Sequence, residues 1–145
     1  MKANQQDQMQ IRELCDSVAR GIRARNVDQV MAAYAEDVVQ FDVRSPLAQK
    51  GANEVRKTTQ GWFDSWEGAI ECEVRDLTIA TGGDTAFAYS FNRTAGITKD
   101  GQRVEMWVRW TGCFRKANGA WKLTHEHVSV PFDPKTMKAD LGLTP

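Results

Sequence analysis

Two histidines, the only two in this chain of 145 residues, stand two positions apart near its C-terminal end. They fall within the segment 121–132, whose alternating side chains and β-branched residues predict a strand. Side chains at positions i and i+2 of a strand point the same way. His125 and His127 therefore share a face with Trp121 and Leu123, and we expect this apolar face to be buried. Two imidazoles on such a face predict a pocket.

Three roles are open to this histidine pair. Neutral imidazole can take and give a proton near neutral pH, so the pair could act in acid/base catalysis or bind a substrate by hydrogen bonds. The rings could instead be satisfied polar groups in a wet pocket. A metal site is the third possibility, but Glu126, the best additional ligand, is predicted to point away from the two rings. We therefore expect no metal.

Composition excludes several classes of function. Nineteen basic and nineteen acidic residues cancel, and no stretch is densely basic, so neither nucleic acid nor a membrane surface is expected as a partner. The first ten residues are polar, and no apolar run approaches the roughly 20 residues that span a bilayer. Three scattered cysteines without a CxxC pair indicate packed, reduced thiols. We expect a cytoplasmic protein with a single domain, 1–145, and, since no nucleotide loop is present, no cofactor.

Hydrophobic periodicity predicts helices followed by strands. Apolar residues recur at three- and four-residue steps in about 4–25, and shorter helices are predicted at about 27–34 and 51–66. A short strand is expected at 38–43. Long strands are expected at about 69–80, 85–98, 103–116 and 121–130. This order predicts an α+β domain in which the helices cover the concave face of a curved, mostly antiparallel sheet and leave a cone.

Asp100-Gly101 and Asn118-Gly119 predict two-residue hairpin turns, which set the register of the last three strands. On that register Gly112 pairs with His125, and Trp110 pairs with both His127 and Phe91. The predicted core face then carries Phe87, Tyr89, Phe91, Arg93, Val104, Met106, Val108, Trp110, Phe114, Leu123, His125 and His127. The predicted outer face carries Asn92, Glu105, Trp107, Arg109, Thr111 and Glu126. Trp107, among polar residues, is the candidate for a homodimer contact.

The stretches Phe41-Asp42-Val43, Met106-Trp107-Val108-Arg109 and 125–133 (HEHVSVPFD) resemble the nuclear transport factor 2-like superfamily, more narrowly its SnoaL-like, ketosteroid-isomerase-homologue subgroup. The resemblance covers nearly the whole chain and implies a cystatin-like cone with a deep pocket, usually dimeric. It implies no single reaction, because one fold hosts many functions.

The resemblance places Asp42 at the position of a catalytic base, after the first short strand. Strand alternation alone disagrees, because it turns Phe41 and Val43 inward and Asp42 outward. Ketosteroid isomerase also needs a tyrosine and a protonated aspartic acid to hold the oxyanion. Those positions fall near Ala19 and Trp110 here, so this particular activity is not expected.

Further candidate site residues follow from the predicted core face and the third helix. Arg93 needs a partner if buried, and Asp42 or a ligand oxygen would serve; the alternative is a rim position with the guanidinium in water. Aromatic residues are either plain core or the walls of a site for a flat ligand. The candidate ligand-binding set is Tyr34, Trp62, Trp66, Phe91, Arg93, Val108 and Trp110, with Asp42, His125 and His127 as candidate catalytic residues.

These residues predict a protein whose pocket takes a small apolar molecule. The leading interpretation is an isomerase, cyclase or lyase that acts on a small carbonyl compound by acid/base chemistry without a cofactor. The alternative is a ligand-binding or dimeric assembly module with no chemistry.

Overall fold

The structure, a computed structural model, describes residues 2–145. The elements in order are α1 (Ala3–Arg23), α2 (Val27–Met31), β1 (Tyr34–Phe41), β2 (Gln49–Lys50), α3 (Ala52–Asp64), β3 (Trp66–Gly82), β4 (Thr85–Thr98), β5 (Arg103–Ala117), β6 (Ala120–Ser129), β7 (Phe132–Asp133) and β8 (Lys138–Ala139). Helices followed by long strands confirm the predicted α+β class.

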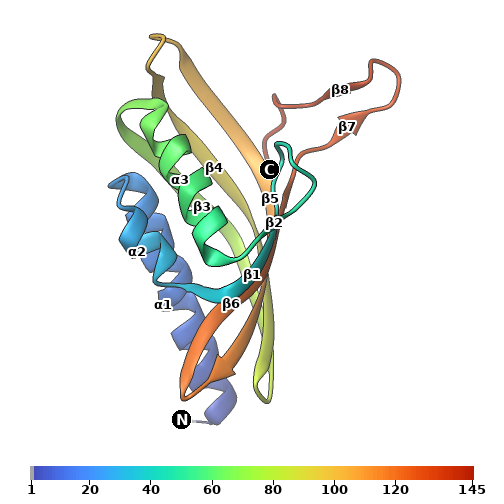
Figure 1. Ribbon diagram of the computed structural model, residues 1–145. Coiled ribbons are helices and arrows are strands. Elements are labelled where there is room, and N and C mark those ends of the chain that lie inside the picture. Colours follow the sequence, from blue (N-terminus) through green and yellow to red (C-terminus); the bar gives the residue numbers. More distant parts are fainter. Residues whose placement is uncertain (1) are drawn as a thin grey trace.

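Six strands form one curved sheet in the order β2-β1-β6-β5-β4-β3. All neighbouring strands are antiparallel except β1 and β6, which run parallel. The three helices lie against one face of this sheet, and the β7–β8 hairpin projects away from it (Figure 1). The arrangement is the predicted cone: the sheet is curved and not closed into a barrel, and its concave face meets the helices.

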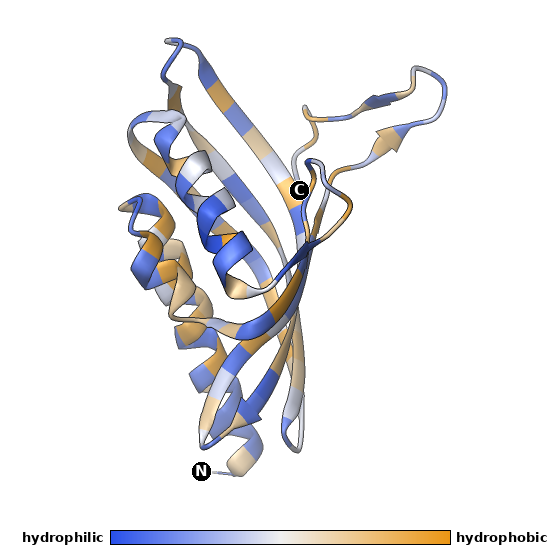
Figure 2. Ribbon diagram, viewed as in Figure 1, coloured by the Kyte–Doolittle hydropathy of each residue, from blue (hydrophilic) through white to orange (hydrophobic). Residues whose placement is uncertain are grey.

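The helices pack through apolar faces. Ile11 of α1 is fully buried in a cluster with Phe114, Trp121 and Leu123 of the sheet. α1 and α2 approach closely at Gly21, where an added Cβ would lie 2.9 Å from the Val30 side chain. Hydrophobic and hydrophilic residues alternate along the long strands, the pattern of a sheet with two different faces (Figure 2).

The β4–β5 hairpin differs from the prediction by one residue. Thr98 and Gln102 hydrogen-bond across a three-residue loop that contains Gly101 at a φ of +82°. Ser90 therefore pairs with Trp110, and Phe91 pairs with Arg109. A one-residue shift turns every side chain of a strand to the other face. The predicted inward set of β4 is thus wrong: Phe87, Tyr89, Phe91 and Arg93 lie on the outer face, and Ser90, Asn92 and Thr94 face the helices.

The β5–β6 hairpin has the predicted register next to its turn and a different register farther along the strands. Asn118 and Gly119, both at positive φ, form a two-residue loop, and Phe114 pairs with Leu123. A β-bulge at Thr124 then shifts the register, so that Cys113 pairs with His125 and Gly112 pairs with Glu126. The predicted pairs of Gly112 with His125 and of Trp110 with His127 are wrong beyond that bulge.

Candidate functional site

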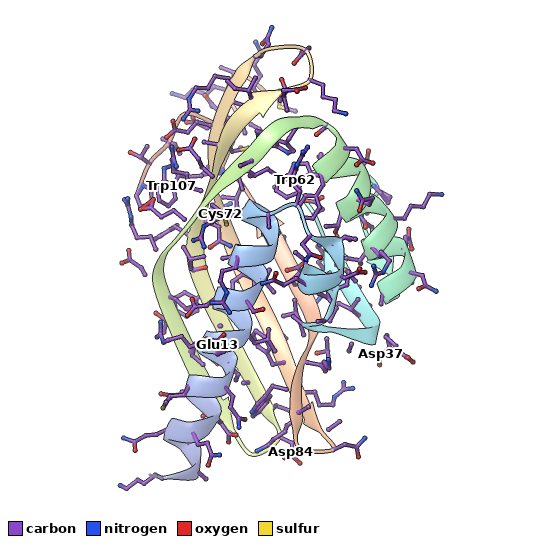
Figure 3. All side chains as sticks on the ribbon, turned by 90° about the vertical axis from the view of Figure 1, so that its left-hand side faces the viewer. Glu13, Asp37, Trp62, Cys72, Asp84 and Trp107 are labelled. Atoms are coloured by element: carbon purple, nitrogen blue, oxygen red, sulfur yellow. The ribbon has the colours of Figure 1, made fainter. Side chains whose placement is uncertain are left out.

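A cavity of about 510 Å³ lies between the helices and the concave face of the sheet. Residues of 14–22 in α1 and 58–62 in α3 supply its helical wall, and residues of β3, β4, β5 and β6 supply the opposite wall. Trp62 of α3 lies between its helix and the sheet, whereas Trp107 lies outside the sheet (Figure 3). Its lining includes Leu14, Cys15, Val18, Tyr34, Gln40, Asp42, Arg44, Trp62, Cys72, Ser90, Asn92, Val108, Trp110, Glu126, Val128 and Val130.

The carboxylate of Glu126 is the most closely held polar group of this cavity. Glu126 is only 5% exposed. Oε1 accepts hydrogen bonds from the Tyr34 hydroxyl and from Nε2 of Gln40, both at 2.5 Å, and Oε2 accepts one from Nε1 of Trp110 at 2.8 Å. Within residues 2–145 no cationic side chain pairs with it. Neutral donors alone therefore hold this buried carboxylate.

Sheet pairing explains how these donors reach Glu126. Gln40 of β1 is its direct partner in the parallel ladder. Gly112 is its partner on β5, and a Cβ there would lie 2.5 Å from the Trp110 ring. The missing side chain at Gly112 thus leaves the space in which the indole lies and from which its N–H reaches the carboxylate.

Tyr34 acts as a permanent donor in this group. Burial, and after it the negative charge of Glu126, raises the pKa of the Tyr34 hydroxyl well above its usual value of 10.0. Its single proton is directed at Glu126. Tyr34 is therefore a support for the carboxylate and has no second proton to offer a ligand.

Asp42 also lines the cavity, one residue beyond the end of β1. Its side chain is 15% exposed, and its two oxygens accept from the backbone N–H of Val43 at 2.7 Å and from Arg44 at 3.2 Å. The conflict between strand alternation and family resemblance is thereby decided in favour of the resemblance. The apolar neighbours Phe41 and Val43, each more than a third exposed, do not form the core that alternation suggested.

Asn92 offers free hydrogen-bond donors to the cavity. The Ser90 hydroxyl donates to its Oδ1 at 2.6 Å, which orients the amide group. Among the described residues no acceptor contacts the amide nitrogen of Asn92. Two N–H donors on the sheet wall are therefore available to a ligand.

The two histidines lie outside this cavity, so the prediction that they share a pocket with Trp110 is wrong. His125 bonds through Nδ1 to the carbonyl oxygen of Val39 at 2.7 Å, and its ring packs edge-on against Phe41 with 4.7 Å between centroids. His127 is exposed beside the same phenylalanine. The bulge at Thr124 is the physical reason, because it reverses the alternation before residue 125.

Some of the other predicted site residues line the cavity, and the rest lie elsewhere. Tyr34, Trp62, Val108 and Trp110 line the cavity, as the prediction placed them. Trp66 is buried beneath Gly96, and Phe91 lies on the outer face.

Arg93 also lies on the outer face and pairs there with Glu105 at 2.9 Å and with Glu71 at 3.8 Å. The hydrogen bond that Arg93 donates to the Glu105 carboxylate raises the pKa of Arg93 above its usual value. Asp42 is therefore not its partner, contrary to one of the two expectations.

Sequence reasoning missed Glu126, Gln40 and Asn92. One signal pointed to Glu126: Val128 and Val130, apolar residues that line the cavity, stand in phase with it along β6. Counting backward from them, instead of forward from Trp121, would have turned Glu126 inward.

The thiols near the cavity are poor nucleophiles. Burial raises the pKa of Cys15 to about 12, and burial also raises that of Cys72. All three cysteines are free. Across residues 2–145 no group of three or more histidine, cysteine, aspartate or glutamate side chains is arranged to hold a metal ion. In the same range no helix has the length and apolar character needed to cross a membrane.

Both the sequence and the fold of this chain are similar to those of known proteins. Residues 11–133 match the SnoaL-like domain family. An NTF2-like protein of unknown function from Pseudomonas putida KT2440 is 32% identical, with a TM-score of 0.85 over 93% of this chain and 94% of that one. No curated protein matches the sequence.

Two more distant structures show the same fold. A candidate dehydratase of the NTF2-like family from Streptomyces avermitilis is 17% identical, with a TM-score of 0.76 over 88% of this chain and 97% of that one. A ketosteroid isomerase-like protein from Erwinia carotovora atroseptica SCRI1043 is 20% identical, with a TM-score of 0.72 over 83% and 93% of the two chains.

Proposed function

The chain belongs to the SnoaL-like family of the NTF2-like superfamily, and we propose that it is an isomerase, cyclase or lyase that acts on a small, largely apolar carbonyl compound without a cofactor. The observation that carries the proposal is that Asp42 and Asn92 both line one largely apolar cavity. Asp42 offers a carboxylate base, and Asn92 offers free N–H donors. Chemistry beside a carbonyl needs both.

Asp42 is the base in this proposal. Its carboxylate takes the proton from the carbon next to the substrate carbonyl, and the electron pair of that C–H bond passes to the carbonyl oxygen. The Asn92 amide donates a hydrogen bond to the resulting enolate oxygen. Return of the proton to another carbon completes an isomerisation, and loss of a leaving group completes an elimination. The histidines have no part in this scheme, because they line the opposite face of the sheet.

Hydrogen–deuterium exchange tests the proposal without knowledge of the natural substrate. Cyclic ketones such as 1-tetralone would be incubated with the protein in deuterated buffer, and exchange next to the carbonyl would be followed by mass spectrometry. Asp42→Asn should lower the catalysed exchange by about 100-fold or more. His127→Ala is the control and should leave it unchanged.

Two outcomes of that experiment count against catalysis. Equal exchange by the wild type and Asp42→Asn would refute the role of the base. Binding of the ketones without exchange would favour the alternative function, a ligand-binding module of the same fold.

The outer face of the sheet supports a second part of the proposal, a homodimer packed sheet to sheet. Phe87 and Tyr89 are each 48% exposed there, and Phe91 is 39% exposed. Trp107 lies beside them on β5, with the Arg75 guanidinium 4.4 Å from its ring centre. A contiguous exposed aromatic patch is typical of an interaction surface. A twofold axis through this patch would cover it with the same patch of a second copy.

A further inference from the structure

The carboxylate of Glu126 has hydrogen-bonding capacity that the protein does not fill. A carboxylate offers about four acceptor positions. Tyr34 and Gln40 both use Oε1, whereas Trp110 alone uses Oε2. Glu126 forms part of the cavity wall, so a ligand in the cavity is the candidate donor for the remaining position on Oε2.

The charges around the cavity decide which ligands can use that position. Asp42, Arg44 and Glu126 are the charged residues of its lining. Arg44 pairs with Asp42, and its side chain is 55% exposed, so its charge lies toward the solvent. No cationic side chain of the described residues, 2–145, pairs with Glu126, so its negative charge deep in the wall is uncompensated there. An anionic ligand would be repelled there, because Coulomb interactions strengthen away from water.

A neutral donor meets the opposite situation. A hydroxyl or N–H group pointing at Oε2 would make a charge-assisted hydrogen bond, which is stronger than one between neutral groups. The rest of the cavity wall is largely apolar, with Leu14, Val18, Trp62 and Val108 among its members. A cation would be attracted to Glu126, but burying it against an apolar wall costs desolvation, which a single ion pair repays only with excellent geometry and additional hydrogen bonds.

We propose that the cavity selects neutral, mainly apolar molecules that carry a hydroxyl or N–H donor, that Glu126 accepts this donor, and that it rejects the corresponding anions. This inference deepens the proposed function, since it concerns the ligand of the same cavity. It rests on the binding part of that function alone and does not require Asp42 to act as a base.

A matched set of biphenyls tests the selection by calorimetry at neutral pH. The probes are 4-phenylphenol, biphenyl, 4-phenylbenzoate and 4-phenylbenzylamine, which differ only in the group presented to Glu126. The wild type should bind 4-phenylphenol about tenfold more tightly than each of the other three. In Glu126→Gln the phenol should lose most of this advantage and the benzoate should gain affinity. Glu105→Gln removes the same charge from the outer face and should change neither.

Several results would overturn the inference. These are wild-type affinities for biphenyl or 4-phenylbenzoate that equal the affinity for the phenol, tighter binding of the amine, no measurable binding of any probe, or an unchanged ranking in Glu126→Gln. If that variant fails to fold, Trp110→Phe frees a second acceptor position on Oε2 and should raise the preference for the phenol over biphenyl, and an unchanged preference would overturn the inference. Loss of ketone exchange in Asp42→Asn with the wild-type ranking intact would show that ligand selection and catalysis are separate properties.

Discussion

The two faces of the sheet hold their charged groups in opposite ways. On the inner face Glu126 is buried and surrounded by three neutral donors. On the outer face Arg93 and Arg103 pair with Glu71 and Glu105, with salt bridges of 2.9 Å on both arginines. The outer charges are screened by water and partly cancel one another. Within the part of the chain that the structure describes, the inner carboxylate has no cationic partner and is held by hydrogen bonds alone, which suits the ligand-binding role proposed for it.

Replacing Glu126 on the inner face and Glu105 on the outer face should give the largest difference in the free energy of unfolding between the two faces. Glu126→Ala leaves Tyr34, Gln40 and Trp110 without an acceptor, and we expect a loss of about 3 kcal/mol or more in the free energy of unfolding. Glu105→Ala removes an exposed partner and should cost far less. Urea unfolding of both variants measures the difference. Similar losses would show that the inner hydrogen bonds contribute no more than the outer ion pairs.

A charge placed on the outer aromatic patch should affect association and not folding. Tyr89→Asp would bury a carboxylate in the proposed dimer interface, and we expect the dimer dissociation constant to rise about 100-fold or more. Sedimentation velocity checks this, with Lys57→Asp on exposed α3 as the control. A wild-type protein that is monomeric at micromolar concentration would contradict the proposed dimer.

Gly112 allows the packing that supplies Glu126 with its indole donor. A methyl group there would lie 2.5 Å from the Trp110 ring and 2.9 Å from Leu123. We expect Gly112→Ala to lower the free energy of unfolding by about 1–3 kcal/mol. Gly61→Ala on α3 has open space around it and should instead stabilise the protein. Urea unfolding that leaves Gly112→Ala as stable as the wild type would show that Trp110 moves aside without loss.

The burial of Cys15 on the inner wall should appear as a dependence of stability on pH. Its pKa is about 12 in the folded protein, compared with 9.0 for an ordinary thiol. Above pH 9 the unfolded chain releases this proton and the folded chain keeps it, so the free energy of unfolding falls as pH rises. The contribution is up to about 1.4 kcal/mol per pH unit.

Urea unfolding of the wild type and of Cys15→Ser at several pH values above 9 isolates this contribution. The serine variant should lose less stability as pH rises. Identical slopes for the two proteins would contradict the assignment to Cys15.

Much of the fold followed from local patterns in the sequence. The apolar stripe of α1, the Asn118-Gly119 turn and the pairing of Phe114 with Leu123 were all predicted and are all confirmed. These features depend on residues close together in the chain. The aromatic residues Tyr34, Trp62 and Trp110 were also placed in the cavity by such patterns, since large apolar side chains on helix and strand faces turn toward the core.

The direction of individual polar side chains depended on longer-range details. The loop that contains Gly101 is one residue longer than predicted, and this turns Asn92 inward and Phe91 outward. The bulge at Thr124 turns Glu126 inward and the two histidines outward. A strand has a side-chain period of two, so a single residue is enough to reverse a face. Such a shift changes little in hydrophobicity or turn propensity, and the local sequence therefore carries almost no signal of it.

By itself, the sequence determined the class of fold, the order of the three helices and the five longer strands, and the family; the short strands β2, β7 and β8 were not predicted. Those properties are sums over many residues, so a single local error does not change them. Only the tertiary structure decided that Glu126 and Asp42 are the carboxylates of the cavity and that His125 and His127 belong to the outer face. The reason is that the register between strands is set by packing across the whole sheet, where the helices must cover a continuous apolar surface.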